Sequence, residues 1–356
     1  MSPSLSIVVC SLNGSEGVDR CLSALRAQTV RQSLEVIVVD DGSTDSTSQV
    51  ARARGVVVVR HTSSHGISAA RNSGIKVASA PIVAFLDDDC EPEPQWAERL
   101  LASYDDNVAG LGGPLLVPAG RGLVLGYLAR RNPLDPQELD LAKSSNMVYR
   151  LLLYLRRQWL SPQFAGRRQV FSLASANMSV RRAALLAVGG FDERIRFGSE
   201  DEDLCRRLAG AFPTQCLIFD PAARVVHHFK PSLRDMLRRS RAYGAGSALM
   251  YRKWPDVRPT FFPFPVIVLV TLAGSLRFPS LALAAIVLPQ LFYPKGLRAA
   301  IGERNLRCML DPYLQLAQES CDDFGFLEGL WRFRHLAPVP RAGPARTVEP
   351  DWEPEA

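Results

Sequence analysis

The sequence predicts an α/β fold in which a mostly parallel sheet is flanked by helices. Continuous Val- and Ile-rich runs occur at residues 4–11, 34–43, 56–60 and 82–89, with helix-like segments between them. Runs that are apolar throughout are typical of parallel strands buried on both faces. Polar clusters follow the first, second and fourth runs, and ligands of open α/β sheets bind beyond the carboxyl ends of strands. We therefore expect these clusters to line one cleft.

The expected elements follow from local signals along the chain. The first strand ends at Asn13-Gly14, and the segment 66–78 (GISAARNSGIKVA) predicts a helix before the fourth strand. Beyond it the sequence predicts a helix at 95–104, a turn and strand at 110–118, a strand, turn and helix at 171–193, and a further helix at 198–210. Residues 121–170 are rich in Arg and Leu and give no clear assignment.

The composition changes sharply between residues 261 and 293, where Arg277 is the single charge. Each half of this segment offers roughly 16 apolar residues, about 24 Å of helix against a hydrocarbon core of about 30 Å. Basic residues flank both ends, which places both on the cytoplasmic side by the positive-inside rule. We expect a helical apolar hairpin that is membrane-associated, either spanning or re-entrant. A buried hairpin of a soluble domain is the alternative.

Residues 232–254 predict a basic amphipathic helix of the kind that suits a membrane surface. The predicted organisation is a catalytic domain at 1–232, then this helix, the hairpin and C-terminal helices at 233–336. A tail at 337–356, rich in Pro and Glu, is expected to be disordered. The predicted location is the cytoplasmic face of the cell membrane.

Composition narrows the class of partner. The 356 residues are 47% hydrophobic and carry a net charge of +6, which fits a phosphate-bearing substrate or an anionic membrane face. No basic array interleaved with aromatic residues is present, so nucleic acid is not an expected partner.

The 7 cysteines form no CxxC pair, which argues against a disulfide framework or a zinc site and for a reducing compartment. The N-terminus lacks a basic region and predicts a first strand, not a signal peptide.

Three adjacent aspartates, Asp87, Asp88 and Asp89, end the fourth apolar run. Like charges repel, and a carboxylate beside an apolar core is costly unless a positive partner compensates it. Carboxylate oxygens suit Mg²⁺ or Mn²⁺, which also take the oxygens of a substrate phosphate. The sequence therefore predicts a metal site here, with a solvated acidic turn as the alternative.

Three further motifs carry candidate chemistry. Asp41 follows the second strand and can accept a hydrogen bond from a nucleobase imide, although Asp-Gly is also an ordinary turn. Asp201 lies in an acidic helix start (SEDED), where it is a candidate general base or a simple helix-capping residue. His227 ends a strand-like segment and is a candidate metal ligand, whereas a lone His is more often structural.

Taken in order, these segments resemble the family 2 glycosyltransferases, which have the GT-A, Rossmann-like fold. The segments that carry the resemblance are 6–29, 35–47, 66–75, 82–96, 175–193 and 200–208. The resemblance covers roughly residues 4–235. It implies inverting, metal-dependent transfer of a sugar from a nucleotide-sugar donor to a saccharide or lipid-linked acceptor, as in polysaccharide or glycolipid synthesis. One carboxylate opposite the leaving group gives in-line displacement, and a divalent cation stabilises the charge on the leaving diphosphate.

The resemblance also assigns roles by residue. Asp201 matches the catalytic base, Asp87 and Asp89 match the family's DxD pair, and His227 matches a histidine that completes the metal site in some members. The substrate-binding residues implied are Asn13, Asp41, Arg71, Asp87, Asp88 and Glu200. The usual Pro-Thr-Tyr-Asn is Cys10-Ser11-Leu12-Asn13 here, so only the Asn is kept. Residues 237–244 (LRRSRAYG) are faintly similar to the diphosphate-binding motif of processive synthases but lack its Gln and Trp.

Two other functions remain open from the sequence. A nucleotidyltransferase-like enzyme has a similar fold, but residues 10–17 lack the Lys and Gly-rich loop that such an enzyme would use. A non-catalytic, nucleotide-sugar-binding membrane scaffold is the other alternative, against which the intact Asp87, Asp89 and Asp201 argue.

Overall fold

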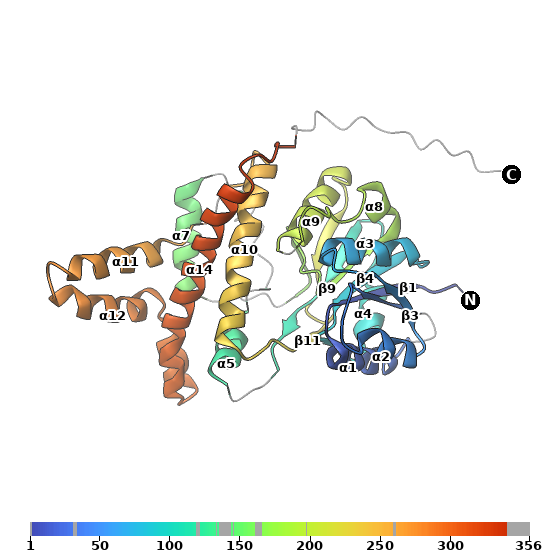
Figure 1. The fold of residues 1–356 in the computed structure, drawn as a ribbon, viewed down its shortest axis with the longest axis horizontal. Helices are drawn as coiled ribbons and strands as arrows, with labels where there is room; N and C mark the ends of the chain where they lie inside the picture. The colour runs from blue at the N-terminus through green and yellow to red at the C-terminus, as the bar shows by residue number, and fades with distance from the viewer. Residues whose placement is uncertain are drawn as a thin grey trace.

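The chain forms a sheet-based body and a separate layer of long helices beside it (Figure 1). The computed structural model describes residues 2–30, 34–118, 122–132, 134, 144, 146–160, 166–196, 198–258 and 261–339. The predicted tail from residue 340 onward lies outside the described residues.

The main sheet has the strand order β3-β2-β1-β4-β9-β6-β10-β8. Its strands are β1 (Leu5–Ser11), β2 (Leu34–Asp40), β3 (Val57–Arg60), β4 (Ile82–Asp87), β6 (Val108–Gly112), β8 (Arg168–Val170), β9 (Asn177–Arg181) and β10 (Cys216–Phe219). The pairs among β3, β2, β1 and β4 are parallel, as is the β6–β10 pair. β9 and β8 pair antiparallel to their neighbours, so the sheet is mixed in its second half. The expectation of an α/β fold built on a largely parallel sheet is thus confirmed.

Helices cover both faces of this sheet because its central strands are apolar on both sides. α1 (Ser15–Arg26), α2 (Thr47–Ala53) and α4 (Trp96–Ala102) cover one face. α3 (Ile67–Val77), α8 (Arg182–Ala187) and α9 (Glu200–Ala211) cover the other (Figure 1). Successive residues of β1 alternate between the two cores, Ile7 and Val9 in one and Val8 and Cys10 in the other. This alternation explains why the whole strand is apolar.

A second, three-stranded sheet positions the metal-binding candidates. Its order is β5-β11-β7, from β5 (Cys90–Pro92), β11 (Val225–His227) and β7 (Leu115–Leu116). β11 runs antiparallel to β5 with His227 opposite Cys90. This pairing brings His227 next to Asp89, the last residue of the aspartate cluster, although the two are far apart in the sequence.

The helical layer contains α5 (Leu123–Arg130), α7 (Met147–Trp159), α10 (Leu233–Lys253) and α14 (Asp311–Arg332). Within this layer α5 contributes Val124, Tyr127 and Leu128 to a small core that also contains Phe229, Met236 and Leu314. α5 and α7 come from the segment that the sequence leaves unassigned. α10, predicted as a surface helix, packs along α14 and buries Met236, Leu249 and Met250. The predicted domain boundary at residue 232 stays a prediction.

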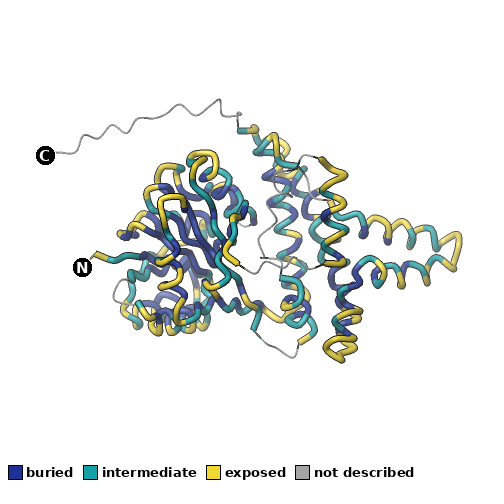
Figure 2. Tube along the Cα trace, turned by 180° about the vertical axis from the view of Figure 1, so that it is seen from behind, coloured by how far each residue is buried: buried dark blue, intermediate teal, exposed yellow. Residues whose placement is uncertain are grey.

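The predicted apolar hairpin consists of α11 (Pro263–Ser275) and α12 (Ser280–Phe292), and it projects from the helical layer (Figure 1). Most of its length is exposed or half-buried (Figure 2), so it is not a hairpin enclosed in a soluble core. α13 (Lys295–Gly302) and a short 3₁₀ turn, η2 (Leu306–Leu310), lead from it to α14. In the described residues no single helix has the length and apolar composition to cross a membrane. The pair α12 and α13 meets both criteria together, with a bend of 70°.

Glycines let α10 and α14 approach each other closely. A Cβ atom on Gly325 of α14 would lie 2.0 Å from the carbonyl oxygen of Arg241 on α10. A Cβ atom on Gly244 of α10 would lie 1.9 Å from the carbonyl oxygen of Asp322 on α14. Both contacts are to backbone, which cannot move aside without separating the helices.

We expect Gly325→Ala to lower the free energy of unfolding by about 2 kcal/mol, because the overpacking outweighs the gain in helix propensity. The matched control is Gly210→Ala in α9, where a Cβ atom would meet nothing within 4 Å. That change should leave stability unchanged or raise it by about 1 kcal/mol. Urea unfolding of both variants measures the difference, and equal midpoints would contradict the close packing.

Candidate active site

The polar segments after β1, β2 and β4 meet at one edge of the main sheet, as the sequence predicts. The Asn13 backbone N–H donates to Ser43 Oγ at 2.8 Å, and the Asn13 side chain accepts from the Thr44 N–H at 2.8 Å. Asn13 has a positive φ of 57°, a conformation that Asn tolerates better than most residues. Ser11 Oγ donates to Asp88. The first polar segment is thus bonded to both of the others.

Asp88 approaches the loop after β1 because that loop lacks side chains at two positions. A Cβ atom on Gly14 would lie 1.9 Å from Asp88 Oδ2, and one on Gly17 would lie 2.7 Å from the Asp88 carbonyl oxygen. Burial raises the pKa of Asp88 to about 7, against the bond from Ser11, and the negative charges of Asp89 and Asp87 add to the rise. The Asn-Gly turn of the sequence therefore makes room for the middle aspartate.

Asp41 is buried and accepts hydrogen bonds from four donors. They are His61 Nδ1 at 2.7 Å, Ser64 Oγ at 2.8 Å, and the backbone N–H groups of His65 at 3.0 Å and Gly66 at 2.9 Å. Burial alone would raise the pKa of Asp41, but these bonds outweigh it and lower the pKa. The carboxylate thereby fixes the loop that leads into α3. Its predicted contact with a nucleobase stays a prediction.

Arg71 of α3 joins two parts of the site that are far apart in sequence. Its side chain is almost fully buried, with Nη2 2.9 Å from Asp87 Oδ1 at the end of β4 and Nη1 2.8 Å from Glu200 Oε1 at the start of α9. Burial would lower the pKa of Arg71, but Asp87 and Glu200 outweigh it and raise the pKa. Three residues predicted to bind substrate are thus bonded to one another.

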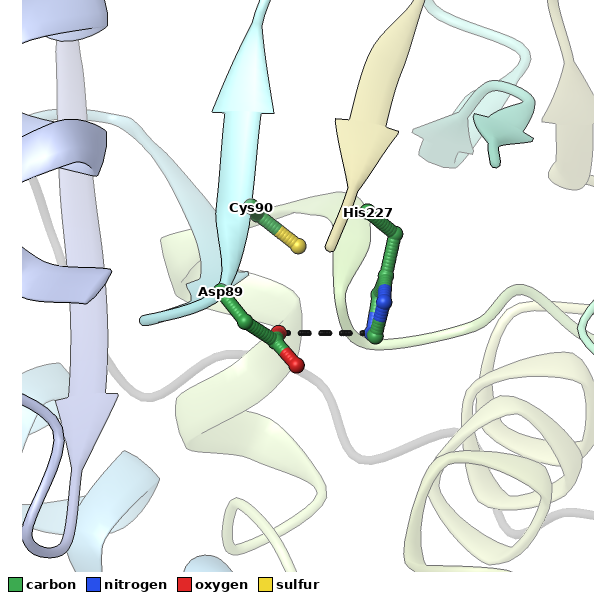
Figure 3. A group of neighbouring side chains, drawn as sticks. All are labelled: Asp89, Cys90 and His227. Atoms are coloured by element: carbon green, nitrogen blue, oxygen red, sulfur yellow. Dashed lines mark ion pairs between the residues drawn. The ribbon is translucent and has the colours of Figure 1, made fainter. Parts of the chain in front are cut away.

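The side chains of Asp89 and His227 point toward each other and form a corner (Figure 3). Asp89 Oδ1 lies 3.3 Å from His227 Nε2. Asp89 Oδ1 and His227 Nδ1 have no hydrogen-bond partner among the described residues. Burial lowers the pKa of His227 to about 4, so its imidazole is neutral. Burial, with the charge of Asp87, raises the pKa of Asp89 to about 7. A carboxylate oxygen and a neutral imidazole are donors that fit a shared divalent cation.

Cys90 is a third potential donor that sequence reasoning missed. Its Sγ, Asp89 and His227 offer ligand atoms within 4.8 Å of one another (Figure 3). Burial raises the pKa of the Cys90 thiol well above its usual value, and the thiol donates to the Ala176 carbonyl at 3.4 Å. A neutral thiol is a poor ligand for Mg²⁺ or Mn²⁺. Asp87, which pairs with Arg71, lies outside this group, and its role as a ligand stays a prediction.

Arg239 of α10 brings a positive charge to the same corner. Its guanidinium lies over the Phe229 ring at 4.8 Å, and that ring stacks on His227 with centroids 4.0 Å apart. The charge of Arg239 opposes the rise in the pKa of Asp89. The basic character of 237–244 is a signal in the sequence, but which arginine faces the corner depends on how α10 packs.

Asp201 lies in the first turn of α9, half-buried. Its Oδ2 accepts from the Ser175 N–H at 3.2 Å and its Oδ1 from the Glu202 N–H at 2.8 Å. Burial, with the negative charge of Glu200, raises the pKa of Asp201 to about 7. The turn before the helix has Gly198 at φ 83° and Ser199 at φ 67°. A carboxyl group with this pKa can both hold and release a proton near neutral pH.

The start of α9 is anchored to α10. A Cβ atom on Gly246 of α10 would lie 2.7 Å from the Gly198 carbonyl oxygen. Fully buried Asp203 accepts from Lys253 Nζ at 2.5 Å and from Trp254 Nε1 at 3.0 Å. Asp203 also pairs with Arg207 one helical turn on, but sequence reasoning treated it only as a neighbour of Asp201, because Lys253 and Trp254 lie some fifty residues further along. The helical layer therefore fixes the position of the candidate base.

An α/β sheet with clustered carboxylates at its strand ends, a corner whose donors fit a divalent cation and a separate acid with a raised pKa is the arrangement expected of a GT-A-type glycosyltransferase. The family model described as "Glycosyl transferase family 2" matches residues 6–173, and that described as "Glycosyl transferase family group 2" matches residues 139–294. The chain belongs to the family 2 glycosyltransferases.

The chain is similar to named members of this class. It is 32% identical over 259 residues to a pre-mycofactocin glycosyltransferase from Mycobacterium tuberculosis, covering 71% of this chain and 48% of the relative. It is 32% identical over 227 residues to a validoxylamine A glucosyltransferase from Streptomyces hygroscopicus, covering 58% and 51%. The chain thus spans about half the length of these curated relatives. A mannosyltransferase structure from Pyrobaculum calidifontis shares the fold, with a TM-score of 0.56 and 18% identity over 93% of this chain and 88% of that one.

We expect Arg71→Met to destabilise the fold by about 3–5 kcal/mol, because Asp87 and Glu200 would keep their charges without a partner. Arg71→Lys should restore part of this loss, since one ammonium group cannot bond both carboxylates with the geometry of the guanidinium. The control is Arg194→Met, which removes an exposed partner of Asp192 and should cost at most about 1 kcal/mol. Urea unfolding measures all three, and wild-type stability of Arg71→Met would refute the bridging role.

Proposed function

We propose that the chain is an inverting, metal-dependent glycosyltransferase that moves a sugar from a nucleoside-diphosphate-sugar to an acceptor hydroxyl. The observation that carries the proposal is the pairing of a cation-binding corner with a candidate base at the same sheet edge. Asp89 and His227 form the corner, and Asp201 is the base. Arg71 links the two, through Asp87 on one side and Glu200 on the other.

The similar proteins support the donor class. The Pyrobaculum calidifontis mannosyltransferase is described in complex with GDP-mannose and Mn²⁺. The Streptomyces relative is named a glucosyltransferase. Because the chain spans only half of its curated relatives, the activity is inferred from the site and the family together. A nucleotide sugar is the donor that these comparisons and the carboxylate-rich strand ends favour.

Asp89 and His227 would hold Mg²⁺ or Mn²⁺. The bound cation would stabilise the negative charge that develops on the leaving diphosphate. Arg239, which lies over Phe229 beside this corner, adds a positive charge that favours the same anion. Ser11 holds Asp88 against the loop after β1, and the Asn13 bonds to Ser43 and Thr44 keep that loop against the β2 turn.

Asp201 would accept the proton of the acceptor hydroxyl during attack. Its two backbone hydrogen bonds fix the carboxylate, and the raised pKa makes it a stronger base than an exposed aspartate. A single carboxylate on the acceptor side is the arrangement of in-line displacement, which inverts the anomeric centre. Buried Asp203, paired with Lys253, positions the helix and does not take part in proton transfer.

The acceptor we propose is a saccharide or a lipid-linked saccharide at the cytoplasmic face of the cell membrane, in polysaccharide or glycolipid synthesis. The support is the α11–α12 hairpin, in which large apolar side chains such as Leu269, Leu276 and Leu283 are exposed. At about 20 Å each, its helices are shorter than a bilayer core of about 30 Å. Insertion of the hairpin into the membrane would remove this surface from water.

We expect one nucleoside diphosphate from a panel to raise the Tm of the protein only when Mn²⁺ or Mg²⁺ is present. Ligand at a hundred times its Kd stabilises by about 2.7 kcal/mol. Asp89→Asn and His227→Gln should weaken this metal-dependent shift. His228→Gln should weaken it much less, because His228 Nε2 pairs with Glu91 at 2.8 Å and is not one of the grouped donor atoms. If no nucleotide shifts the Tm and no nucleotide sugar is cleaved, the proposed function is wrong.

We expect Asp201→Asn to keep nucleotide affinity while lowering transfer by about 10²–10⁴-fold, the usual contribution of a general base. In the wild type kcat/KM should fall at least tenfold per pH unit below a pH of about 7, because the raised pKa of Asp201 leaves the base protonated there and Asp89 titrates in the same range. Glu202→Gln, one residue further on, is the control and should keep both activity and pH profile. Loss of donor binding in Asp201→Asn would show that the base is misassigned.

A further inference from the structure

The helix α7 turns an apolar stripe toward the outside of the molecule. Val148, Leu151, Leu152, Leu155 and Trp159 recur at the spacing of one helix face. Val148 is 67% exposed and Leu152 58%, and Leu151 and Trp159 are exposed as well. A helix of a water-soluble protein normally directs such a stripe into the core.

The opposite side of α7 faces the other helices of the layer, and it is polar. Tyr154 Oη donates to Glu319 Oε2 at 2.7 Å, and the buried Gln158 accepts from Gln315 Nε2 at 2.8 Å. Leu153 is the one apolar residue of α7 that is fully buried among the described residues. The amphipathic helix is thus inverted, with its polar groups inside and its apolar groups outside. This arrangement is favourable only where the outer surroundings are apolar.

α7 lies at the base of the α11–α12 hairpin and runs across it (Figure 1). The Tyr154 ring lies 5.4 Å from the Phe264 ring of α11. Arg298 of α13 donates to the Trp159 carbonyl and lies over the Trp159 ring at 5.2 Å. The exposed stripe of α7 is therefore continuous with the exposed surface of the hairpin and α13.

The charges on this surface have one sign. Residues 147–159 and 263–302 contain no Asp or Glu, and their six charged residues are Arg150, Arg156, Arg157, Arg277, Lys295 and Arg298. Burial, together with the positive charges of Arg131, Arg157 and Arg298, lowers the pKa of Lys295 to about 8. Cations that crowd one another around an apolar surface are suited to anionic headgroups above an acyl layer.

We propose that α7 lies in the interface of an anionic phospholipid bilayer, with its apolar stripe in the acyl layer and the hairpin inserted beside it. The proposal rests on the membrane association of the proposed function but adds a second, in-plane contact. A hairpin alone leaves the body free to rotate about the hairpin axis, whereas a helix lying in the plane fixes that rotation. A second copy of the chain fits this surface poorly, because an isologous contact would bring the same cations together.

Flotation of the full chain with vesicles of phosphatidylcholine, with and without phosphatidylglycerol, tests this proposal. We expect binding to the anionic vesicles that weakens as the salt concentration rises. Leu152→Glu in α7 should weaken it about tenfold. The matched control is Leu186→Glu in α8, a leucine 51% exposed on the catalytic body, which should bind as wild type. Leu269→Glu tests the hairpin separately.

A depth measurement provides a second readout that does not depend on affinity. Phosphatidylcholine with brominated acyl chains should quench tryptophan fluorescence in the wild type, and Trp159→Phe should remove most of this quenching. The in-plane contact is wrong if Leu269→Glu abolishes binding while Leu152→Glu floats as wild type and quenching persists in Trp159→Phe. It is also wrong if the wild type does not bind vesicles and sediments as a dimer that Leu152→Glu dissociates.

Cleavage of nucleotide sugar with a soluble acceptor is measured alongside, so that loss of membrane binding is distinguished from failure of the glycosyltransferase proposal.

Discussion

The bridge that Arg71 makes between Asp87 and Glu200 is the interaction on which the rest of the site depends. Asp87 ends the strand that leads to the corner formed by Asp89 and His227, and Glu200 precedes the candidate base. Two carboxylates this close to the core would repel each other without the guanidinium. The planar fork of an arginine can bond both at once, which a lysine cannot do. The separation between Asp89 and Asp201 is thus set by a side chain that does not itself need to react.

The helical layer has a matching role on the other side of the candidate base. The close contact of Gly246 with the Gly198 carbonyl, and the bonds from Lys253 and Trp254 to Asp203, hold the start of α9 against α10. α10 is in turn fixed to α14 through glycines. The candidate base is therefore positioned from two sides, by the sheet through Arg71 and by the helices through α10.

The strand ends and their polar residues were predictable from the sequence, because a strand buried on both faces must be apolar throughout and its polar end is then conspicuous. The same local signals predicted Asp89 and His227 as partners, which β5 and β11 bring together. The bonds from Lys253 and Trp254 to Asp203 and the choice of Arg239 were not predictable, since they depend on how α10 packs. α7 lies in the Arg- and Leu-rich segment that was left unassigned, and although its apolar spacing is helical, nothing in the sequence says that the stripe faces outward.

The inverted arrangement of α7 connects the chemistry to its surroundings. α7, α10 and α14 belong to one layer, in which Glu319 of α14 bonds Tyr154 of α7 and α14 packs on α10. If α7 and the hairpin fix this layer to a bilayer, the same layer fixes α9 and hence Asp201 relative to that surface. An acceptor carried by a lipid would then meet a base whose orientation to the membrane is already set. Proximity of this kind lowers the entropic cost of bringing acceptor and donor together, and it gives a physical reason for building the anchor and the support of the base from the same helices.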